Sequence, residues 1–400
     1  MLDNELTDFG KEYLQLGLRI NKHINGYIDY YYGPRNIKLI VENENIKSPK
    51  NLLKACKSLQ NQLRNQAFDE NRIKYFDKTL LAIHTILQKL DGEKIPYLTL
   101  IENIFDFTPE FYDDDYFYNL AIKANELYRG TGSLYEKMNK YAEQRTIPLY
   151  KLENFFKKAI SVARNRTKEL FPNLLPASEN VNIEFVENKR WWMYNWYLGN
   201  FKSRIEVNKS NNVYWTDLLN FACHEGYPGH HTESSTKEYL LYRKRSLFEV
   251  SIKLLYTPDM VISEGIATTA DLILFTPKEM LSYLLENFCI NPELEDSLEI
   301  LVEQSLIKRN LRYFEHKLAY YKYVEGWENE KLKRFVRELG IYPEEGLNTV
   351  IQYISDEIGA IYSIIYQGEL IIKKKYGEHP DPNHFLELIT NQILPSDIYR

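Results

Sequence analysis

The stretch "CHEGYPGHH", residues 223–231, holds three of the chain's eight histidines and one glutamate. It begins with His224 and Glu225, and Pro228 stands four residues after the first histidine, where a second ligand on the same helix face would be expected. Two explanations are open. The stretch is either a metal site on an interrupted helix or a histidine-rich turn that holds no metal.

The spacing of the histidines does not fit a straight helix. In the His-Glu-x-x-His motif of zinc peptidases, the two histidines are one turn apart and can bind the same ion. Here His230 and His231 follow His224 by six and seven residues. A six-residue step rotates a side chain about 120° from the required face, and a seven-residue step carries it about 10 Å along the axis.

Pro228 itself excludes a straight helix. Proline has no N–H to give to the carbonyl of His224, and its ring would clash with that carbonyl. Gly229 then relaxes the limits on the backbone. We therefore predict that the helix bulges or breaks between Glu225 and Gly229, so that His224 and His230 converge on one metal with Glu225 as the base.

A third ligand is expected on a later helix, because a catalytic zinc usually has three protein ligands and one open position. The segment "VISEGIATTADL", 261–272, follows a proline that can start a helix. Glu264 is the leading candidate. Thr268 and Asp271 share its face, and Asp271 could orient a histidine from behind. His231 is expected beside the metal without a defined role.

The rest of the chain predicts a mainly α, large bilobed helical fold with a small antiparallel β-sheet beside the motif helix. Apolar residues recur every three or four positions in most of 1–170, and again in two long patterns at 296–339 and 344–376. Three short β-type segments within 181–208 predict an antiparallel meander. We expect a helical lobe over residues 1–170 and a second lobe, with the motif, over 171–400.

Charge and hydropathy exclude other classes. A net charge of −6 provides no basic face for nucleic acid. No apolar run is long enough to predict a membrane span. The N-terminus, "MLDNELTDFGKEYLQLGLRI", has acidic residues where a signal peptide needs basic ones. Three scattered cysteines favour a reducing compartment, so a cytoplasmic protein of open oligomeric state is expected.

The motif and its flanks resemble a known family. "HEGYPGHH", with "YLGNFKSRIEVN" before it and "EGIATTAD" after it, is similar to the bacterial family called domain of unknown function 885. Members of that family resemble zinc metallopeptidases of the gluzincin kind, related in architecture to carboxypeptidase Taq and the thimet oligopeptidases. The resemblance runs through most of the chain, since further segments also fit it: "GYIDYYYGP", "YQGELII" and "LPSDIYR".

The resemblance implies that His224, His230 and Glu264 bind zinc and that Glu225 is the catalytic acid and base. The chain departs from the family pattern at Ile266, where the family has tryptophan. It also departs at Thr232-Glu233, where the family has Leu-Gln. These departures affect the surroundings of the metal core and leave the core itself intact.

The resemblance also implies a hydrogen-bond donor for the transition state, from a tyrosine shortly before Gly368. Tyr362 and Tyr366 are the two candidates, with Arg309 and Arg312 as alternatives that could equally be exposed helix residues. The strand "FKSRIEVN" could offer its edge to an extended peptide, or it could be an internal strand of the sheet.

The sequence therefore predicts a zinc-dependent hydrolase, most simply a peptidase that cleaves short peptides in a cleft between the lobes. One alternative is a non-catalytic member of the family that binds a peptide or a protein partner. Another is a zinc hydrolase of a non-peptide amide or ester. Glu225 favours catalysis, because a binding module has no need of it.

Overall fold

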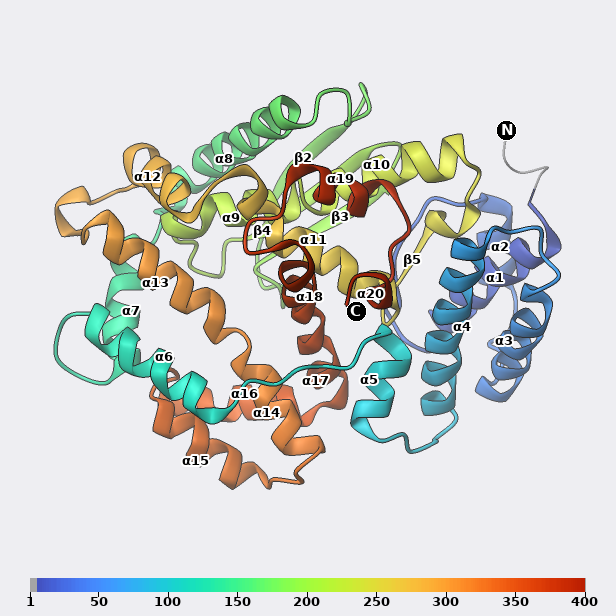
Figure 1. The fold of residues 1–400 in the computed structure, drawn as a ribbon, viewed down its shortest axis with the longest axis horizontal. Helices are drawn as coiled ribbons and strands as arrows, with labels where there is room; N and C mark the ends of the chain where they lie inside the picture. The colour runs from blue at the N-terminus through green and yellow to red at the C-terminus, as the bar shows by residue number, and fades with distance from the viewer. Residues whose placement is uncertain (1–5, 400) are drawn as a thin grey trace.

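The computed structural model describes residues 6–399, and Figure 1 shows their arrangement. The chain is mainly α-helical, as predicted, with two small sheets. The N-terminal segment "MLDNELTDFGKEYLQLGLRI", which was not expected to be a signal peptide, falls partly outside the described residues, at positions 1–5. Arg400, at the end of "LPSDIYR", lies outside them as well.

The N-terminal helices are amphipathic, and most of them begin at side-chain caps. The Thr7 hydroxyl accepts from the N–H of Gly10 at 3.2 Å, and the Asp69 carboxylate accepts from the N–H of Arg72 at 2.8 Å. Such caps satisfy donors that a helix N-terminus leaves unpaired. In Figure 1, α1 to α5 lie together on one side of the molecule and α6 and α7 on the other. The helices are α1 (Asp8–Ile20), α2 (Arg35–Asn43), α3 (Pro49–Leu63), α4 (Glu70–Leu90), α5 (Tyr97–Phe105), α6 (Asp114–Leu127), α7 (Leu134–Arg145) and α8 (Leu149–Leu170).

The three predicted strands form, but not as an antiparallel meander. They are β2 (Asn180–Val186), β3 (Met193–Gly199) and β4 (Lys202–Asn208), in the order β2-β4-β3. β3 and β4 are an antiparallel hairpin, whereas β2 runs parallel to β4.

The loop between β2 and β3 explains why the meander was wrong. The Asn208 side chain donates 2.9 Å hydrogen bonds to the main-chain oxygens of Lys189 and Trp191. These bonds tie the loop to the end of β4, so that β3 lies on the far side of β4 from β2. Of the two possibilities for "FKSRIEVN", the structure shows the second: β4 is an internal strand, and β3 is the edge strand on that side.

A second, unpredicted sheet joins distant parts of the chain. β1 (Ile28–Tyr31) pairs in antiparallel fashion with β5 (Ile252–Leu254). β1 lies in the tyrosine-rich stretch "GYIDYYYGP", and local spacing could not predict its pairing because its partner is more than two hundred residues away. This pairing brings the N-terminal region beside the motif.

The motif region lies toward the middle of Figure 1, and α12, the last helix of this group, lies at the left. The elements are α9 (Leu218–Glu225), α10 (His230–Lys237), a π-helical turn (Glu238–Lys244), α11 (Pro258–Leu274) and α12 (Pro277–Phe288).

The two long C-terminal patterns are broken into shorter helices. Apolar spacing continues across the breaks, so the spacing could not locate them. One break lies in the loop after α14, where Gly326 takes φ 69°. Gly340 and Gly377 follow the last residues of α15 and α18. The helices are α13 (Leu298–Leu311), α14 (Phe314–Tyr323), α15 (Asn329–Leu339), α16 (Leu347–Ser355), α17 (Glu357–Ser363), α18 (Gln367–Tyr376), α19 (Pro382–Thr390) and α20 (Pro395–Ile398).

Two glycines allow α11 and α18 to cross in backbone contact. A Cβ on Gly265 would lie 2.7 Å from the main-chain carbon of Gly368, and a Cβ on Gly368 would lie 2.1 Å from the carbonyl oxygen of Val261. Neither position tolerates a side chain. This close crossing brings Glu264 on α11 next to the segment that contains Tyr362 and Tyr366.

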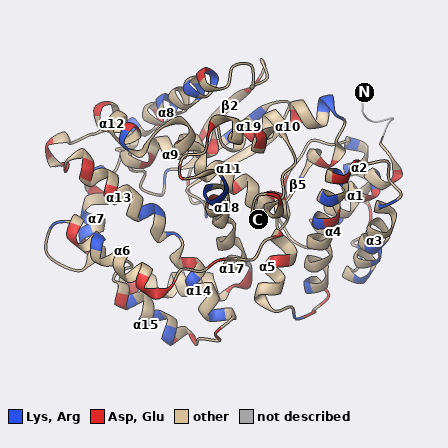
Figure 2. Cartoon of the chain, viewed as in Figure 1, with Lys and Arg blue, Asp and Glu red and all other residues tan. Residues whose placement is uncertain are grey.

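The core consists of two apolar clusters, and each draws on residues from both sides of position 170. The division into lobes at that position stays a prediction. Among the described residues, no single helix has the length and apolar composition to cross a membrane. α11 and α12 meet those criteria only when taken as a pair, which is bent by 74°. Figure 2 shows acidic and basic residues intermingled over the outer helices.

Candidate metal centre

The predicted interruption of the motif helix is confirmed. α9 ends at Glu225, and α10 begins at His230. The four residues between them form a tight turn, in which the N–H of Gly229 donates to the carbonyl of Cys223 at 2.9 Å. A Cβ on Gly229 would lie 2.0 Å from the carbonyl oxygen of His224, so only glycine fits there. The turn therefore resets the helix and lets two histidines six residues apart face each other.

The three predicted ligands come together. His224 Nε2 lies 3.7 Å from Glu264 Oε2, and His230 Nε2 lies 3.5 Å from Glu264 Oε1. One ligand atom from each residue lies within 4.8 Å of the others. Ligands about 2.0–2.1 Å from a tetrahedral ion are about 3.3 Å apart, so the observed spacing fits one metal ion with small adjustments. This His-His-Glu group could hold a metal ion.

Charge within the group is arranged around Glu264. Burial raises the pKa of its carboxyl, but His230 outweighs burial and lowers the pKa to about 2. Burial also lowers the pKa of the His230 ring, yet Glu264 raises it to about 9. Burial, with His230 nearby, lowers the pKa of His224 to about 4. His230 and Glu264 therefore form an ion pair here, and a cation that bound the group would displace the His230 proton.

Glu225 lies beside this group and lines the same cavity. Burial raises the pKa of its carboxyl to about 7. The Asn195 side chain on β3 donates to the main-chain oxygen of Glu225, which ties the end of α9 to the sheet. The residue that the sequence predicts as the base is thus next to a ligand, in the wall of a cavity.

The cavity has a volume of about 980 Å³. The side chains of His224, His230 and Glu264 are 19%, 21% and 14% exposed, so the group is accessible from the cavity. Both candidate tyrosines line it, and Glu264 contributes to a raised pKa for each, after burial. Trp191 and Trp192, which directly precede β3, also line the cavity.

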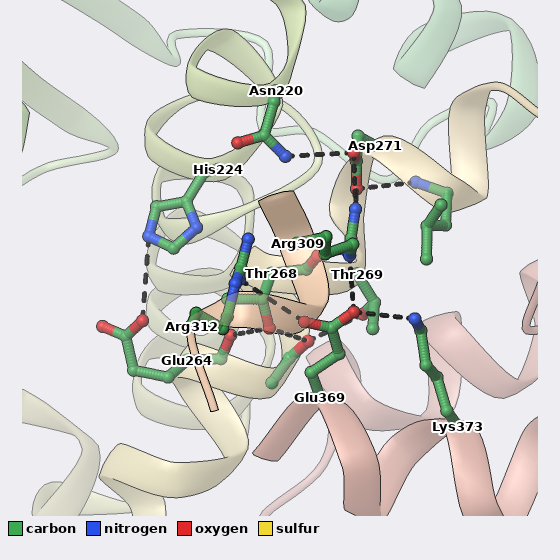
Figure 3. A network of polar contacts seen from close by, with 12 residues as sticks. Asn220, His224, Glu264, Thr268, Thr269, Asp271, Arg309, Arg312, Glu369 and Lys373 are labelled. Carbon is green, nitrogen blue, oxygen red and sulfur yellow. Dashed lines mark hydrogen bonds and ion pairs between the residues drawn. The ribbon is translucent and has the colours of Figure 1, made fainter. Parts of the chain in front are cut away.

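The two candidate arginines differ. Arg312 lines the cavity, and its guanidinium lies 5.8 Å from the ring centre of Tyr366. Arg309 is buried in the network of Figure 3, where it contacts Glu369 at 2.5 Å and Asp271 at 2.9 Å. The expectation of an exposed helix residue is wrong for Arg309. Its guanidinium is fully used by these carboxylates and by the carbonyl of Thr268.

Two other predicted roles fall elsewhere in the structure. Asp271 contacts Arg309 and accepts from Asn220 at 3.0 Å, and no contact with a histidine is found among the described residues. His231 is buried and faces the sheet, away from the His-His-Glu group. Its Nδ1 lies 2.8 Å from Ser203 Oγ and its Nε2 3.1 Å from Glu179 Oε2. His231 therefore joins α10 to the sheet.

Sequence reasoning missed several residues of the cavity wall. Asp29 on β1 accepts a 2.5 Å hydrogen bond from Tyr194 on β3, and Lys253 on β5 lies nearby in the same wall. Glu315 on α14 lines the cavity as well. These residues share no motif and are brought together by long-range packing. Only Ser263, directly before Glu264, could have been noticed from its position.

Comparison with known proteins gives a fold likeness without a function. No protein-family model matches the sequence, and no curated protein matches it. Two solved structures are similar over most of the chain. One is described as a "putative lipoprotein" from Colwellia psychrerythraea, with 12% identity, a TM-score of 0.48, and coverage of 88% of this chain and 68% of that one. The other is described as "a putative lipoprotein of unknown function" from Shewanella oneidensis. It has 12% identity and a TM-score of 0.47, and the match covers 91% of this chain and 75% of that one.

Proposed function

We propose that this protein is a zinc-dependent hydrolase that cleaves short peptides in the cavity beside His224, His230 and Glu264. One observation carries the proposal. Three ligating side chains from α9, α10 and α11 converge on one cavity, and the residue after the first ligand is a glutamate that lines the same cavity. The two-histidine, one-carboxylate set is typical of catalytic zinc. We also propose that the chain is related to the domain of unknown function 885 family.

The chain's own residues supply most of the chemistry. A bound zinc ion supplies Lewis acidity, which activates water and polarises a carbonyl group. Glu225 takes a proton from the attacking water and gives it to the departing amine. Tyr362 or Tyr366 donates a hydrogen bond to the oxygen on which negative charge develops, with Arg312 as the neighbouring positive charge. Only groups that line the cavity are assigned these roles.

A peptide is favoured as the substrate by the wall beside Glu225. β3 is an edge strand, and four of its residues line the cavity: Met193, Tyr194, Asn195 and Tyr197. An extended peptide can pair with such an edge. The tryptophans Trp191 and Trp192, just before β3, extend this wall with apolar surface for side chains of the peptide.

The test measures metal content and peptide cleavage together. We expect about one zinc per chain by plasma mass spectrometry in protein purified without chelator. His230→Ala should lose the metal, whereas the matched control His84→Ala, far from the motif in sequence, should retain it. Glu225→Gln should retain the metal and lose cleavage of a fluorogenic peptide library by at least about 10²-fold.

Each result has a defined meaning. Wild-type protein that takes up no zinc, even when zinc is added back, would overturn the proposal at its first step. If the wild-type protein binds zinc but cleaves no peptide, the proposed peptidase activity is rejected and a metal-binding protein remains. Cleavage that persists in Glu225→Gln would remove Glu225 from the mechanism.

A further inference from the structure

Ser263 contacts a metal ligand from behind. It precedes Glu264 on α11, and its hydroxyl oxygen lies 3.4 Å from Nδ1 of His230, the ring nitrogen that does not face Glu264. The same oxygen lies 2.5 Å from Glu233 Oε2 and 2.5 Å from Lys253 Nζ. One buried hydroxyl thus joins His230 to an acid on α10 and a base on β5.

The direction of each hydrogen bond follows from the chemistry of the groups. A serine hydroxyl has one proton to donate and two lone pairs, a carboxylate can only accept, and an ammonium group can only donate. Ser263 therefore donates to Glu233 and accepts from Lys253. Its remaining lone pair faces His230, so Nδ1 of His230 must carry the proton. The 3.4 Å contact is long for a hydrogen bond, but its direction is determined.

Charges around the hydroxyl keep this direction fixed. Burial raises the pKa of Glu233, but Lys237 and Lys253 outweigh it and hold the pKa well below its usual value. Lys237 Nζ lies 2.7 Å from Glu233 Oε1, and Asp259 lies 3.4 Å from Lys237. Glu233 is thus ionised and can take only the serine proton. No reversed arrangement satisfies the same groups.

We infer that Ser263, oriented by Glu233 and Lys253, positions His230 for metal binding by holding its proton on Nδ1 and leaving the Nε2 lone pair for the ion. This inference rests on the proposed function, because it assumes that His230 is a ligand. Hydrogen bonds of this kind, from the non-ligating nitrogen of a histidine, fix the ring and its tautomer and raise its affinity for metal. Ser263 and Glu233 are positioning residues, because they are argued to act through His230.

The experiment measures zinc affinity by competition with a chromophoric chelator. We expect Ser263→Ala to bind zinc about 10- to 100-fold more weakly than wild type. Ser263→Thr, which keeps the hydroxyl, should restore most of the affinity. The matched control is Ser235→Ala. Ser235 is on α10, and its buried hydroxyl donates to the main-chain oxygen of His231 at 2.7 Å. This control variant should bind zinc as wild type does.

A second measurement needs no variant. In zinc-loaded wild type with ¹⁵N-labelled histidine, NMR should show His230 bound through Nε2 with a proton retained on Nδ1. Binding through Nδ1, or Ser263→Ala with wild-type zinc affinity, would overturn the inference while the proposed function stands. Wild-type protein that binds no zinc would overturn both.

Discussion

At the scale of single residues, the site depends on a position with no chemistry of its own. Gly229 lies against the main-chain oxygens of His224 and Cys223, at 2.0 and 2.4 Å from where a Cβ would be. The turn from Gly226 to Gly229 can then be short enough to rewind the helix with His230 beside His224. The backbone at Gly229 thus sets the position of His230 relative to His224, although Gly229 itself offers no ligand atom.

Gly229→Ala should therefore abolish metal binding and destabilise the protein by about 1–3 kcal/mol or more, because the added methyl group overlaps two carbonyl oxygens. Zinc content and urea unfolding of the purified variant measure the two effects. Gly92→Ala is the control. Gly92 has φ +92° and open space around it, so its substitution costs stability without touching the site. Full zinc content in Gly229→Ala would show that the turn relaxes without moving the histidines.

At the scale of elements, a buried ionic network fixes the helices behind the His-His-Glu group. Glu369 on α18 contacts Arg309 on α13 at 2.5 Å and Lys373 at 2.8 Å, and Arg309 contacts Asp271 on α11 (Figure 3). Burial raises the pKa of Glu369, but the cations, Arg309 first, outweigh it and lower the pKa to about 2. The network holds α11, and hence Glu264, against two neighbouring helices.

Acid should weaken this network over a defined range. Because the folded pKa of Glu369 is below its unfolded value, its contribution is complete above about pH 4.5 and is lost as the pH falls toward 2. Glu369→Gln should lower the unfolding free energy at pH 7 by about 3–5 kcal/mol, since it leaves buried cations uncompensated.

Urea unfolding of both proteins from pH 7 to pH 3 measures this difference. It should shrink below pH 4.5, because the Glu369 carboxyl of unfolded wild type takes up a proton there, whereas the folded carboxyl stays ionised down to about pH 2. A difference that stays constant over the whole range would mean that the folded pKa of Glu369 is not below its unfolded value.

At the scale of the whole molecule, the site joins parts of the chain that are far apart in sequence. The ligands come from α9, α10 and α11, and the cavity wall adds residues from β1, β3, β5 and the helices after α13. An ion bound there would stabilise only the assembled fold, because the unfolded chain does not hold the three ligands together. Metal binding and global stability should therefore be linked.

Zinc should raise the melting temperature of the apoprotein, and a chelator should lower that of protein purified with metal. At a free zinc concentration one hundred times Kd, the added stability is about 2.7 kcal/mol. Calorimetry of wild type and His230→Ala measures the effect, and the variant should not respond. Equal responses in the two proteins would place the bound zinc somewhere other than this group.

Much of the site could be predicted from the sequence because its constraints are local. Pro228 forbids a straight helix whatever surrounds it, and the helix does end at Glu225 and restart at His230. Glu264 was found from a helix pattern and a family resemblance, and it lies within 3.7 Å of both histidines. The prediction of an antiparallel meander was wrong because strand pairing is not a local property. Strand-type spacing identifies a strand but carries no information about which neighbour it pairs with.

The sequence by itself determined the helical class, the break in the motif helix and the identity of the three ligand candidates. The first two follow from periodicity and from a backbone restriction that acts within a few residues, and the ligand candidates also rest on the family resemblance. Only the tertiary structure decided the order of the sheet, the burial of Arg309, the place of His231 and the contact of Ser263 with His230. These depend on which distant segments pack together, and many sequences with the same local patterns would pack differently.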